Sequence, residues 1–331
     1  MKLRDIGEAG LIKWIEEELS SLKEKAVIGI GDDAAAVEVS PERLLLFTTD
    51  SLVEGVHFRW DYTSPYHVGW KGLAVNISDI AAMGGNPTCG VVSLCLSKDT
   101  EVSLIKEVYR GLKDIASLYR IDIAGGNIAR SSVFVLTIML LGEVRRGELL
   151  LRSGAKLGDL IYVTGELGSS AAGLTCLREA NLKVPEEARR LLVRRHLMPS
   201  VRLKEGRKIA KGRFATAMID LSDGLASDLL HLAEKSRVGA LIYEDKIPIS
   251  PFMEKLAEEL GKSPLEWALY GGEDYELLFT VSPEKKEELE KLDISLSLIG
   301  RIVKRQEGVS LVKACGKRVR LRDKGYDHFR L

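Results

Sequence analysis

The chain contains few cysteines, and none is arranged for metal or redox chemistry. Four occur among 331 residues, and no two form a Cys-x-x-Cys pair. A zinc site or a dithiol redox motif built on such pairs is therefore excluded. Unpaired thiols are typical of a reducing compartment, so we expect a cytoplasmic protein.

Excess charge of either sign is also absent. Lys+Arg and Asp+Glu both number 48, so no basic surface indicates a nucleic-acid partner. The longest apolar stretch, from Val133 to Leu141, is interrupted by Thr137 and is far shorter than the roughly 20 residues of a membrane span. The first five residues lack the apolar core of a signal peptide. We expect no nucleic acid and no membrane among the partners.

The common nucleotide-binding loops are missing as well. No G-x-x-x-x-G-K-[ST] motif occurs, so the chain is not a P-loop protein. Gly29-Ile30-Gly31 is not followed by the third glycine of a dinucleotide-binding turn. Any phosphate chemistry must therefore depend on other groups.

The length favours two domains, because a single hydrophobic core seldom grows beyond about 250–300 residues. The sequence changes to Arg, Gly, Lys and Glu around 145–158, and we place the boundary there, with domains 1–147 and 148–331. Periodicity predicts helices over 6–20, 65–84, 101–119, 169–180 and 186–196, and a further helix that carries Leu225, Leu229 and Leu232. It predicts strands over 26–30, 35–39, 44–49, 89–96, 121–124, 133–141, 160–164, 216–219 and 275–281.

Aspartates stand at the turns and ends of these predicted elements. Asp33 lies in a turn between strands, Asp50 closes the strand 44–49, and Asp220 and Asp223 bracket a strand-to-helix corner. Two carboxylates about 4 Å apart repel by roughly 4 kcal/mol at an effective dielectric near 20, so a converging set implies a bound cation. Oxygen ligands without histidine or cysteine select Mg²⁺ or a similar hard cation. Metal held in this way usually implies phosphate.

Each acid also has a simpler structural explanation. A turn carboxylate such as Asp33 can accept hydrogen bonds from backbone N–H groups, and Ser222 or Asp223 can cap the helix that follows. Asp79 is harder to explain, because it lies inside an apolar helix where an unpaired charge is costly. Its alternative partner is Lys71, eight residues earlier on the same helix face.

Short motifs follow one another along almost the whole chain, from about residue 5 to 329. They are Gly29–Ala35, Thr49–Phe58, Lys71–Asp79, Arg152–Lys156, Ile219–Leu225, Gly271–Leu277 and Gly325–Phe329. Together and in this order they resemble the thiamine-monophosphate kinase family of the aminoimidazole-ribonucleotide-synthetase superfamily.

The resemblance implies a two-domain α+β fold, in which the N-terminal domain forms a shared β-barrel within a homodimer and the C-terminal domain is α/β. It implies phosphorylation of thiamine monophosphate to thiamine diphosphate, with ATP and several Mg²⁺ ions bound between the domains. The family's metal ligands correspond to Asp33, Thr48, Thr49, Asp50, Asp79, Asp220 and Asp223. Its ATP contacts correspond to Tyr109, Gly126, Arg152 and Ser222, and its thiamine-phosphate contacts to His57, Glu273 and Tyr326.

One position departs from the family's pattern. The family carries Gly-Gly-Asp-Thr, whereas this chain has Gly125-Gly126-Asn127-Ile128. An amide oxygen can still ligate Mg²⁺, but it brings no charge. We therefore expect Asn127 to face the ATP and metal site as a neutral ligand.

The chemistry of such a reaction agrees with these residues. The second pKa of a phosphate monoester is about 6, so the acceptor is mostly dianionic at neutral pH and needs no general base. Positioning and charge neutralisation suffice, and no catalytic residue beyond the metal ligands is expected. The cationic thiazolium ring suits an aromatic face and a carboxylate, such as Tyr326 and Glu273. Phe58 and Trp60 are either neighbours of that ring or core residues.

Two other hypotheses stay open. Selenophosphate synthetases and hydrogenase-maturation dehydratases of the same superfamily carry a reactive cysteine, near the N-terminus or at the extreme C-terminus. Here no cysteine precedes Cys89, and the sequence ends in His328-Phe329-Arg330-Leu331. The second hypothesis is a non-catalytic sensor of thiamine phosphate or nucleotide, which a product assay would separate from a kinase.

Overall fold

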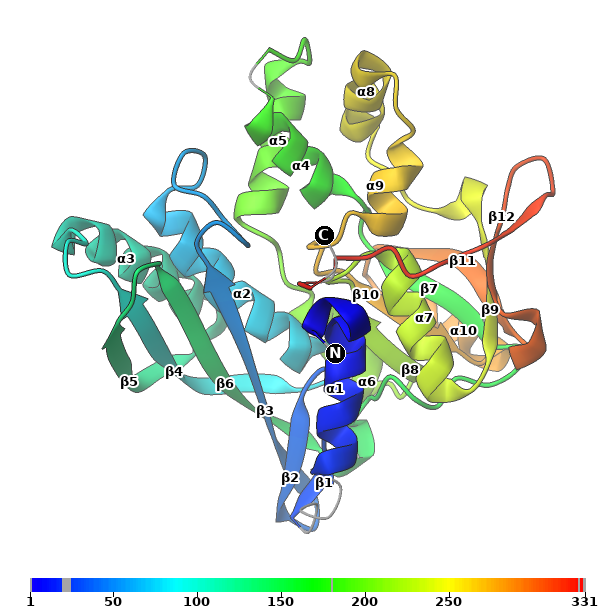
Figure 1. Ribbon diagram of the computed structural model, residues 1–331. Coiled ribbons are helices and arrows are strands. Elements are labelled where there is room, and N and C mark those ends of the chain that lie inside the picture. Colours follow the sequence, from blue (N-terminus) through cyan, green and yellow to red (C-terminus); the bar gives the residue numbers. More distant parts are fainter. Residues whose placement is uncertain (1, 20–24, 180, 327, 330–331) are drawn as a thin grey trace.

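Two β-sheets organise the molecule. The computed structural model describes residues 2–19, 25–179, 181–326 and 328–329. A six-stranded sheet has the order β1-β2-β3-β6-β4-β5, and a seven-stranded sheet has the order β13-β12-β9-β11-β7-β10-β8. Figure 1 shows the two sheets side by side, the first in blue to green and the second in green to red. Both sheets are mixed and open, and neither closes into a barrel in the described residues.

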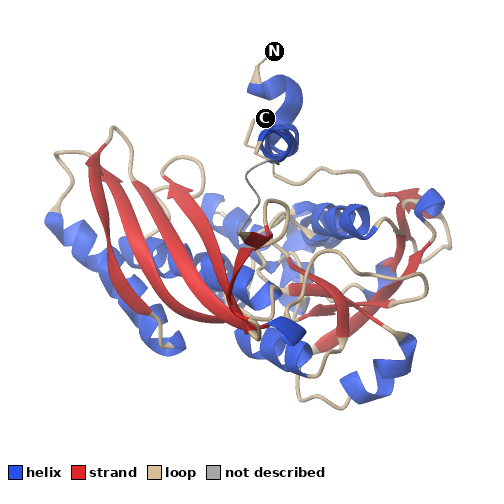
Figure 2. Ribbon diagram, turned by 90° about the horizontal axis from the view of Figure 1, so that it is seen from below, coloured by secondary structure: helices blue, strands red, loops and turns tan. Residues whose placement is uncertain are grey.

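The first sheet is covered by helices on one face only, as Figure 2 shows. Residues at alternate positions of β3, such as Leu44, Leu46 and Leu52, are buried under these helices. Its strands are β1 (Ala26–Ile28), β2 (Ala35–Ser40), β3 (Arg43–Val53), β4 (Asn86–Leu96), β5 (Asp122–Arg130) and β6 (Val135–Arg145). The covering helices are α2 (Pro65–Ala82) and α3 (Val102–Tyr119). The two helices approach so closely that a Cβ on Gly111 would lie 1.9 Å from the Tyr66 carbonyl oxygen.

The second sheet carries helices from the rest of the chain. Its strands are β7 (Leu160–Thr164), β8 (Ala215–Asp220), β9 (Gly239–Tyr243), β10 (Leu277–Val281), β11 (Leu296–Val303), β12 (Val309–Val312) and β13 (Arg318–Arg320). The helices are α4 (Ser169–Arg178), α5 (Glu186–Leu197), α6 (Leu203–Lys211), α7 (Leu225–Ser236), α8 (Pro251–Leu260), α9 (Pro264–Tyr270) and α10 (Lys286–Leu289). Short 3₁₀ turns are η2 (Arg146–Glu148), η3 (Glu244–Lys246), η4 (Pro283–Lys285) and η5 (Arg305–Glu307).

The pairing in this second sheet corrects the expectation of an α/β domain. Only β9 and β12 pair in parallel, and all other neighbours in the sheet are antiparallel. The reason is that β10 inserts between β7 and β8 and runs antiparallel to both. The molecule is therefore α+β in both halves.

Most predicted elements are confirmed, with two informative errors. The strand predicted over 121–124 does not end at Gly125-Gly126, because β5 continues through both glycines to Arg130. The strand predicted over 44–49 does not end at Asp50 either, since β3 continues to Val53. The last residues of the predicted helices 6–20 and 169–180 lie outside the described residues.

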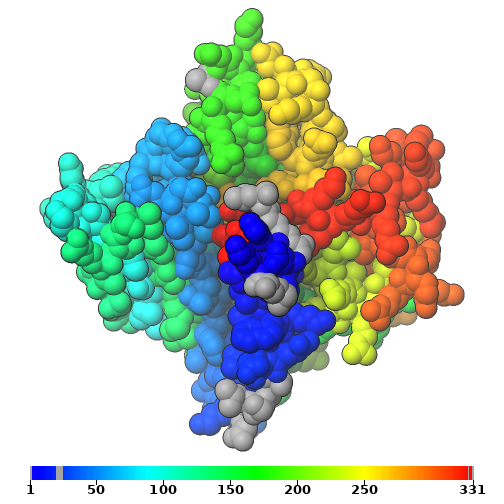
Figure 3. Space-filling model, in the orientation of Figure 1, coloured from blue at the N-terminus to red at the C-terminus, as the bar shows by residue number. Residues whose placement is uncertain are grey.

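Helix α2 connects the two halves. It packs on β3 and β6 of the first sheet and also on α6 and β8 of the second half. This explains why nearly all of its side chains are buried, since a helix that is apolar all round must be covered on all sides. Helix α1 (Leu3–Glu18) lies beside the C-terminal segment, in blue and red at the centre of Figure 3. No helix in the described ranges is long and apolar enough to cross a membrane.

Candidate active site

Three of the predicted metal ligands converge where the two halves meet. Asp33, Asp79 and Asp220 each place one carboxylate oxygen within 4.8 Å of the others. Asp33 comes from the turn between β1 and β2, Asp79 from the C-terminal part of α2, and Asp220 from the end of β8. Residues far apart in sequence thus form one cluster, which is the condition under which the sequence predicts a bound cation.

Hydroxyl groups hold these carboxylates in place. The Thr48 hydroxyl donates to Asp79 Oδ2 at 2.6 Å, and the Ser78 hydroxyl donates to Asp220 Oδ2 at 2.5 Å. Asp50 lies close to this cluster, because, besides burial, the charge of Asp50 raises the pKa values of both Asp79 and Asp220. Thr48 and Asp50 share one face of β3, whereas the exposed Thr49 between them points to the opposite face. The Thr49 side chain therefore does not join the cluster within one chain.

The cluster is electrostatically unfavourable without a cation. Burial raises the pKa of Asp79 well above its ordinary value, and the charges of Asp50, Asp220 and Asp33 raise it further. Burial also raises the pKa of Asp220 to about 8, with repulsion from Asp33 as the next cause. Asp33 Oδ2 is buried and has no hydrogen-bond partner in the described part of the chain. An orphaned oxygen among hard oxygen ligands fits Mg²⁺.

Arg152 offsets part of this negative charge. Its guanidinium donates from Nε and Nη2 to Asp33 Oδ1, at 3.0 and 2.6 Å, and its backbone N–H donates to Asp32 Oδ1 at 2.7 Å. Arg152, which the resemblance assigns to ATP binding, therefore lies beside the carboxylate cluster. Burial lowers its pKa, but the neighbouring Asp33 outweighs burial and the net pKa is raised.

The corner between β8 and α7 supplies the next acids. Burial, with repulsion from Glu8, raises the pKa of Asp223 to about 6. Ser222 does not cap α7, because the helix begins only at Leu225. The capping acceptor is Asp228, which accepts the N–H groups of Asp223 and Gly224 at 3.1 Å each. Sequence reasoning missed Asp228, although an acid in the first turn of a helix was a usable signal.

The three predicted thiamine-phosphate contacts also gather. The rings of His57 and His328 are 5.0 Å apart, and those of Tyr326 and His328 are 4.9 Å apart. Burial lowers the pKa of His57, and the nearby charges of His328, Glu273 and Lys71 also affect this pKa. His57, Tyr326 and Glu273 therefore surround one location. Phe58 instead packs edge-on against Trp60 and Phe134, so the interpretation as core residues holds for Phe58 and Trp60.

Glu273 is the centre of a buried polar network. Its Oε1 lies 2.6 Å from Lys71 Nζ, and its Oε2 lies 3.4 Å from Nδ1 of the buried His196. The same ring nitrogen is 3.1 Å from the Ser170 hydroxyl. Lys71 thus pairs with Glu273 and not with Asp79, which removes the alternative explanation of Asp79. His196 and Ser170 carried no sequence signal, since neither belongs to a motif.

Tyr109, Gly126 and Asn127 lie at the far edge of the first sheet. The register places Asp50, Ile138, Val92 and Gly126 in one row across β3, β6, β4 and β5. Three strand spacings of about 4.8 Å put Gly126 roughly 14 Å from Asp50. Asn127 is exposed and is aligned with Ser51 on the uncovered face. Within one chain, these residues are not beside the carboxylate cluster.

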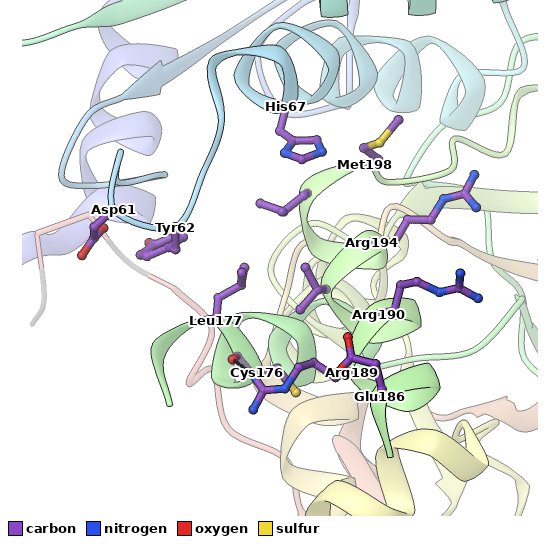
Figure 4. A pocket seen from close by; sticks show the side chains of 12 residues that line it. Asp61, Tyr62, His67, Cys176, Leu177, Glu186, Arg189, Arg190, Arg194 and Met198 are labelled. Carbon is purple, nitrogen blue, oxygen red and sulfur yellow. Dashed lines mark hydrogen bonds between the residues drawn. The ribbon is translucent and has the colours of Figure 1, made fainter. Parts of the chain in front are cut away.

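Two cavities lie outside the cluster. The larger, of about 630 Å³, is lined by α5, α4 and the segment before α2, and three arginines enter it from α5 (Figure 4). None of the predicted site residues lines this cavity. The second, of about 520 Å³, lies between α3 and β5 and is lined by Tyr109, Leu112 and Ile123 among others. Tyr109 therefore has a cavity beside it that is separate from the carboxylates.

Comparison with known proteins identifies the class to which this fold belongs. The family model "AIR synthase related protein, N-terminal domain" matches residues 31–144, and its C-terminal counterpart matches residues 156–313. The two halves with a carboxylate cluster between them therefore define a two-domain protein of the AIR synthase-related class.

Relatives that match this chain over nearly its full length show which family within this class it belongs to. The chain is 42% identical to a thiamine-monophosphate kinase of Aquifex aeolicus, over 99% of this chain and all of the relative. A solved structure described as "AaThiL complexed with AMPPCP and TMP" superposes with a TM-score of 0.88 at 40% identity, covering 99% of both chains. The chain belongs to the thiamine-monophosphate kinase family. A HypE–HypF complex is 18% identical with a TM-score of 0.72 over 93% of this chain and 98% of that one, which shows a common fold alone.

Removing one charge from the cluster should stabilise the metal-free protein. We predict that Asp79→Asn raises the melting temperature in EDTA, because the amide is uncharged in this cluster without having to bind a proton, while the Thr48 hydrogen bond can remain. The stabilisation by Mg²⁺ should shrink, since ligand binding contributes RT ln(1 + [L]/Kd), about 2.7 kcal/mol at 100 times Kd. Thermal melts with EDTA and with Mg²⁺ measure both effects. Asp99→Asn, at an exposed acid, is the control, and a lower melting temperature of Asp79→Asn in EDTA would contradict the prediction.

The buried His196 should make the protein sensitive to mild acid. Burial, followed by the charge of Lys71, lowers the pKa of His196 to about 3, so the folded state stays neutral while the unfolded state gains a proton below pH 6.5. Stability is therefore complete above pH 6.5 and falls with decreasing pH, by up to about 1.4 kcal/mol per pH unit for one proton. We predict that His196→Gln reduces the loss of stability between pH 7 and pH 5 in urea titrations. His67→Gln, at a half-buried histidine, should change it less; equal effects would contradict this assignment.

Proposed function

We propose that the protein transfers the γ-phosphoryl group of ATP to thiamine monophosphate, yielding thiamine diphosphate and ADP. A terminal oxygen of the acceptor phosphate forms the new P–O bond, while the bond from the γ-phosphorus to the β–γ bridging oxygen breaks and ADP leaves. No proton has to be removed, because the acceptor is mostly dianionic at neutral pH. The observation that carries the proposal is the buried carboxylate cluster beside a second group of His57, Tyr326 and Glu273.

Mg²⁺ fits the cluster and supplies charge neutralisation for the two polyanions when bound. The residues that would hold it are Asp33, Thr48, Asp50, Asp79, Asp220 and Asp223. Ser78 and Thr48 orient the carboxylates by donating to them. Arg152, now paired with Asp33, would contact the ATP phosphates, together with Ser222.

Thiamine monophosphate would lie between the cluster and Glu273. A carboxylate and aromatic faces attract a cationic ring, which favours Glu273, His57 and Tyr326 as its surroundings. Of these, the side chain of Glu273 is 28% exposed, whereas Tyr326 is 52% exposed and forms the outer side of the site. The substrate would therefore enter past Tyr326.

We further propose that the protein is a cytoplasmic homodimer, in which each chain consists of domains 1–147 and 148–331. The two chains would associate through the uncovered face of the first sheet. That face carries partly exposed apolar side chains such as Met139, Leu45 and Phe47. A second copy covering it would complete a shared barrel and would bury Thr49 and Asn127. Tyr109, Gly126 and Asn127, which lie away from the cluster of their own chain, would then bind ATP at the subunit boundary.

Product analysis tests the proposed function. We predict that ATP, Mg²⁺ and thiamine monophosphate yield equal amounts of ADP and thiamine diphosphate, separated by chromatography. Asp79→Asn should reduce turnover by at least tenfold and serves as the matched inactive control. ADP without thiamine diphosphate would indicate another acceptor, and binding of thiamine monophosphate without ADP would indicate a sensor.

The amide of Asn127 should set the Mg²⁺ requirement. We predict that Asn127→Asp lowers the Mg²⁺ concentration for half-maximal activity, because a charged ligand binds the cation more tightly, and that Asn127→Ala raises it. A tenfold change would correspond to about 1.4 kcal/mol. Mg²⁺ titration at fixed ATP measures all three proteins. If the curves coincide, Asn127 is only a strand residue of β5.

A further inference from the structure

An ion pair between a buried lysine and a half-buried glutamate links the two halves at the proposed thiamine-phosphate site. Lys71 belongs to α2, Glu273 lies in the turn before β10, and the Nζ and Oε1 atoms are 2.6 Å apart. Lys71 is only 4% exposed, and its ammonium has no well-aligned hydrogen-bond acceptor in the described residues. Burying a charge pair of this kind costs more than packing two apolar side chains. Stability alone therefore does not explain Lys71.

The turn that carries Glu273 is strained. The φ angles of Glu273 and Tyr275 are +58° and +52°, in the left-handed region that non-glycine residues avoid. Such conformations cost about 1–3 kcal/mol each and persist where surrounding contacts impose them, often at functional sites. The surrounding contacts must therefore hold the backbone of Glu273 in this conformation.

Contacts from three sides impose this conformation. The N–H of Glu273 donates to the Ser222 carbonyl at 2.7 Å, and the N–H of Tyr275 donates to the Leu221 carbonyl at 2.9 Å. The Asp274 carboxylate accepts the N–H groups at the start of α4. The turn is therefore fixed to the corner that follows β8 and to α4, and Lys71 fixes its side chain to α2.

The charges around Glu273 favour its ionised form. Burial alone would raise the pKa of Glu273, but the charge of the neighbouring Lys71 outweighs burial and the net pKa is lowered. His196 itself is neutral at physiological pH. Lys71 is thus the group that offsets the cost of keeping this half-buried carboxylate charged.

We propose that Lys71 is a positioning residue for the thiamine-phosphate substrate, acting through Glu273. Its ammonium holds the carboxylate in place beside His57 and Tyr326. Lys71 and Asp79 lie eight residues apart on one helix, about 12 Å along its axis, so α2 also fixes Glu273 relative to the carboxylate cluster. This inference rests on the proposed function, because it assigns a role within that site.

The first test compares two lysine variants. Lys71→Met keeps the length of the side chain and removes its charge, and Lys106→Met makes the same change at an exposed position of α3. We expect Lys71→Met to weaken thiamine-monophosphate binding, measured by calorimetry without ATP, by at least tenfold. The KM for thiamine monophosphate should rise in the same proportion, while the KM for ATP stays within twofold. Wild-type affinity in Lys71→Met would overturn the proposal.

A double-mutant cycle separates this role from a folding defect. Lys71→Met leaves Glu273 half-buried without its partner, so its melting temperature should fall, and adding Glu273→Gln should restore it. Because Lys71 acts through Glu273, the double variant should bind the substrate no more weakly than Glu273→Gln alone. If the loss of affinity in the double variant equals the product of the losses in the two single variants, the proposal is overturned. A wild-type protein that neither binds nor phosphorylates thiamine monophosphate would instead refute the proposed function itself.

Discussion

Repulsion between carboxylates that are buried where two domains meet is the constraint on which the rest of this structure depends. Asp79 stands in an otherwise apolar helix within reach of Asp33, Asp50 and Asp220, and only Arg152 brings a compensating charge to this cluster in the described residues. A fold optimised for stability alone would place apolar groups here. Under the proposed function, this cost would be offset when cations and phosphate bind to the cluster, because a ligand that binds only the folded state stabilises it.

Helix α2 connects the carboxylate cluster to the part of the site where the substrate is proposed to bind. Its residues Lys71 and Ser78 are seven positions apart and so lie on one helix face, and that face meets the second half of the chain. Lys71 pairs with Glu273, and Ser78 donates to Asp220. The other faces of the helix are apolar and are held by the first sheet and α3. A rigid helix anchored in one domain thus positions both the phosphate side and the organic side of the proposed site.

Sequence reasoning could predict the acids and not their arrangement. Asp79 was identifiable because a charge in an apolar helix needs a partner, and Asp220 because it ends a strand before a helix. The strand 121–124 was predicted to end before Gly125-Gly126, because a glycine pair is equally typical of a strand end and of a strand that needs a close approach. A Cβ on Gly126 would lie 1.8 Å from the Val92 carbonyl oxygen, so packing against β4 requires glycine there. The contact of His196 with Glu273 depends on tertiary packing and leaves no local pattern.

The position of Asn127 gives its amide a physical rationale. It lies on the uncovered face of the first sheet, where its cross-strand neighbour on β4 is Ser93, followed by Thr137 on β6. If a second copy covers this face, an aspartate there would lose its hydration and would be stable only while a cation is bound. An amide loses far less on burial and still offers an oxygen to a metal. In the proposed dimer, asparagine at this position would therefore bind a metal less tightly than aspartate, but it would cost less to bury when no nucleotide is bound.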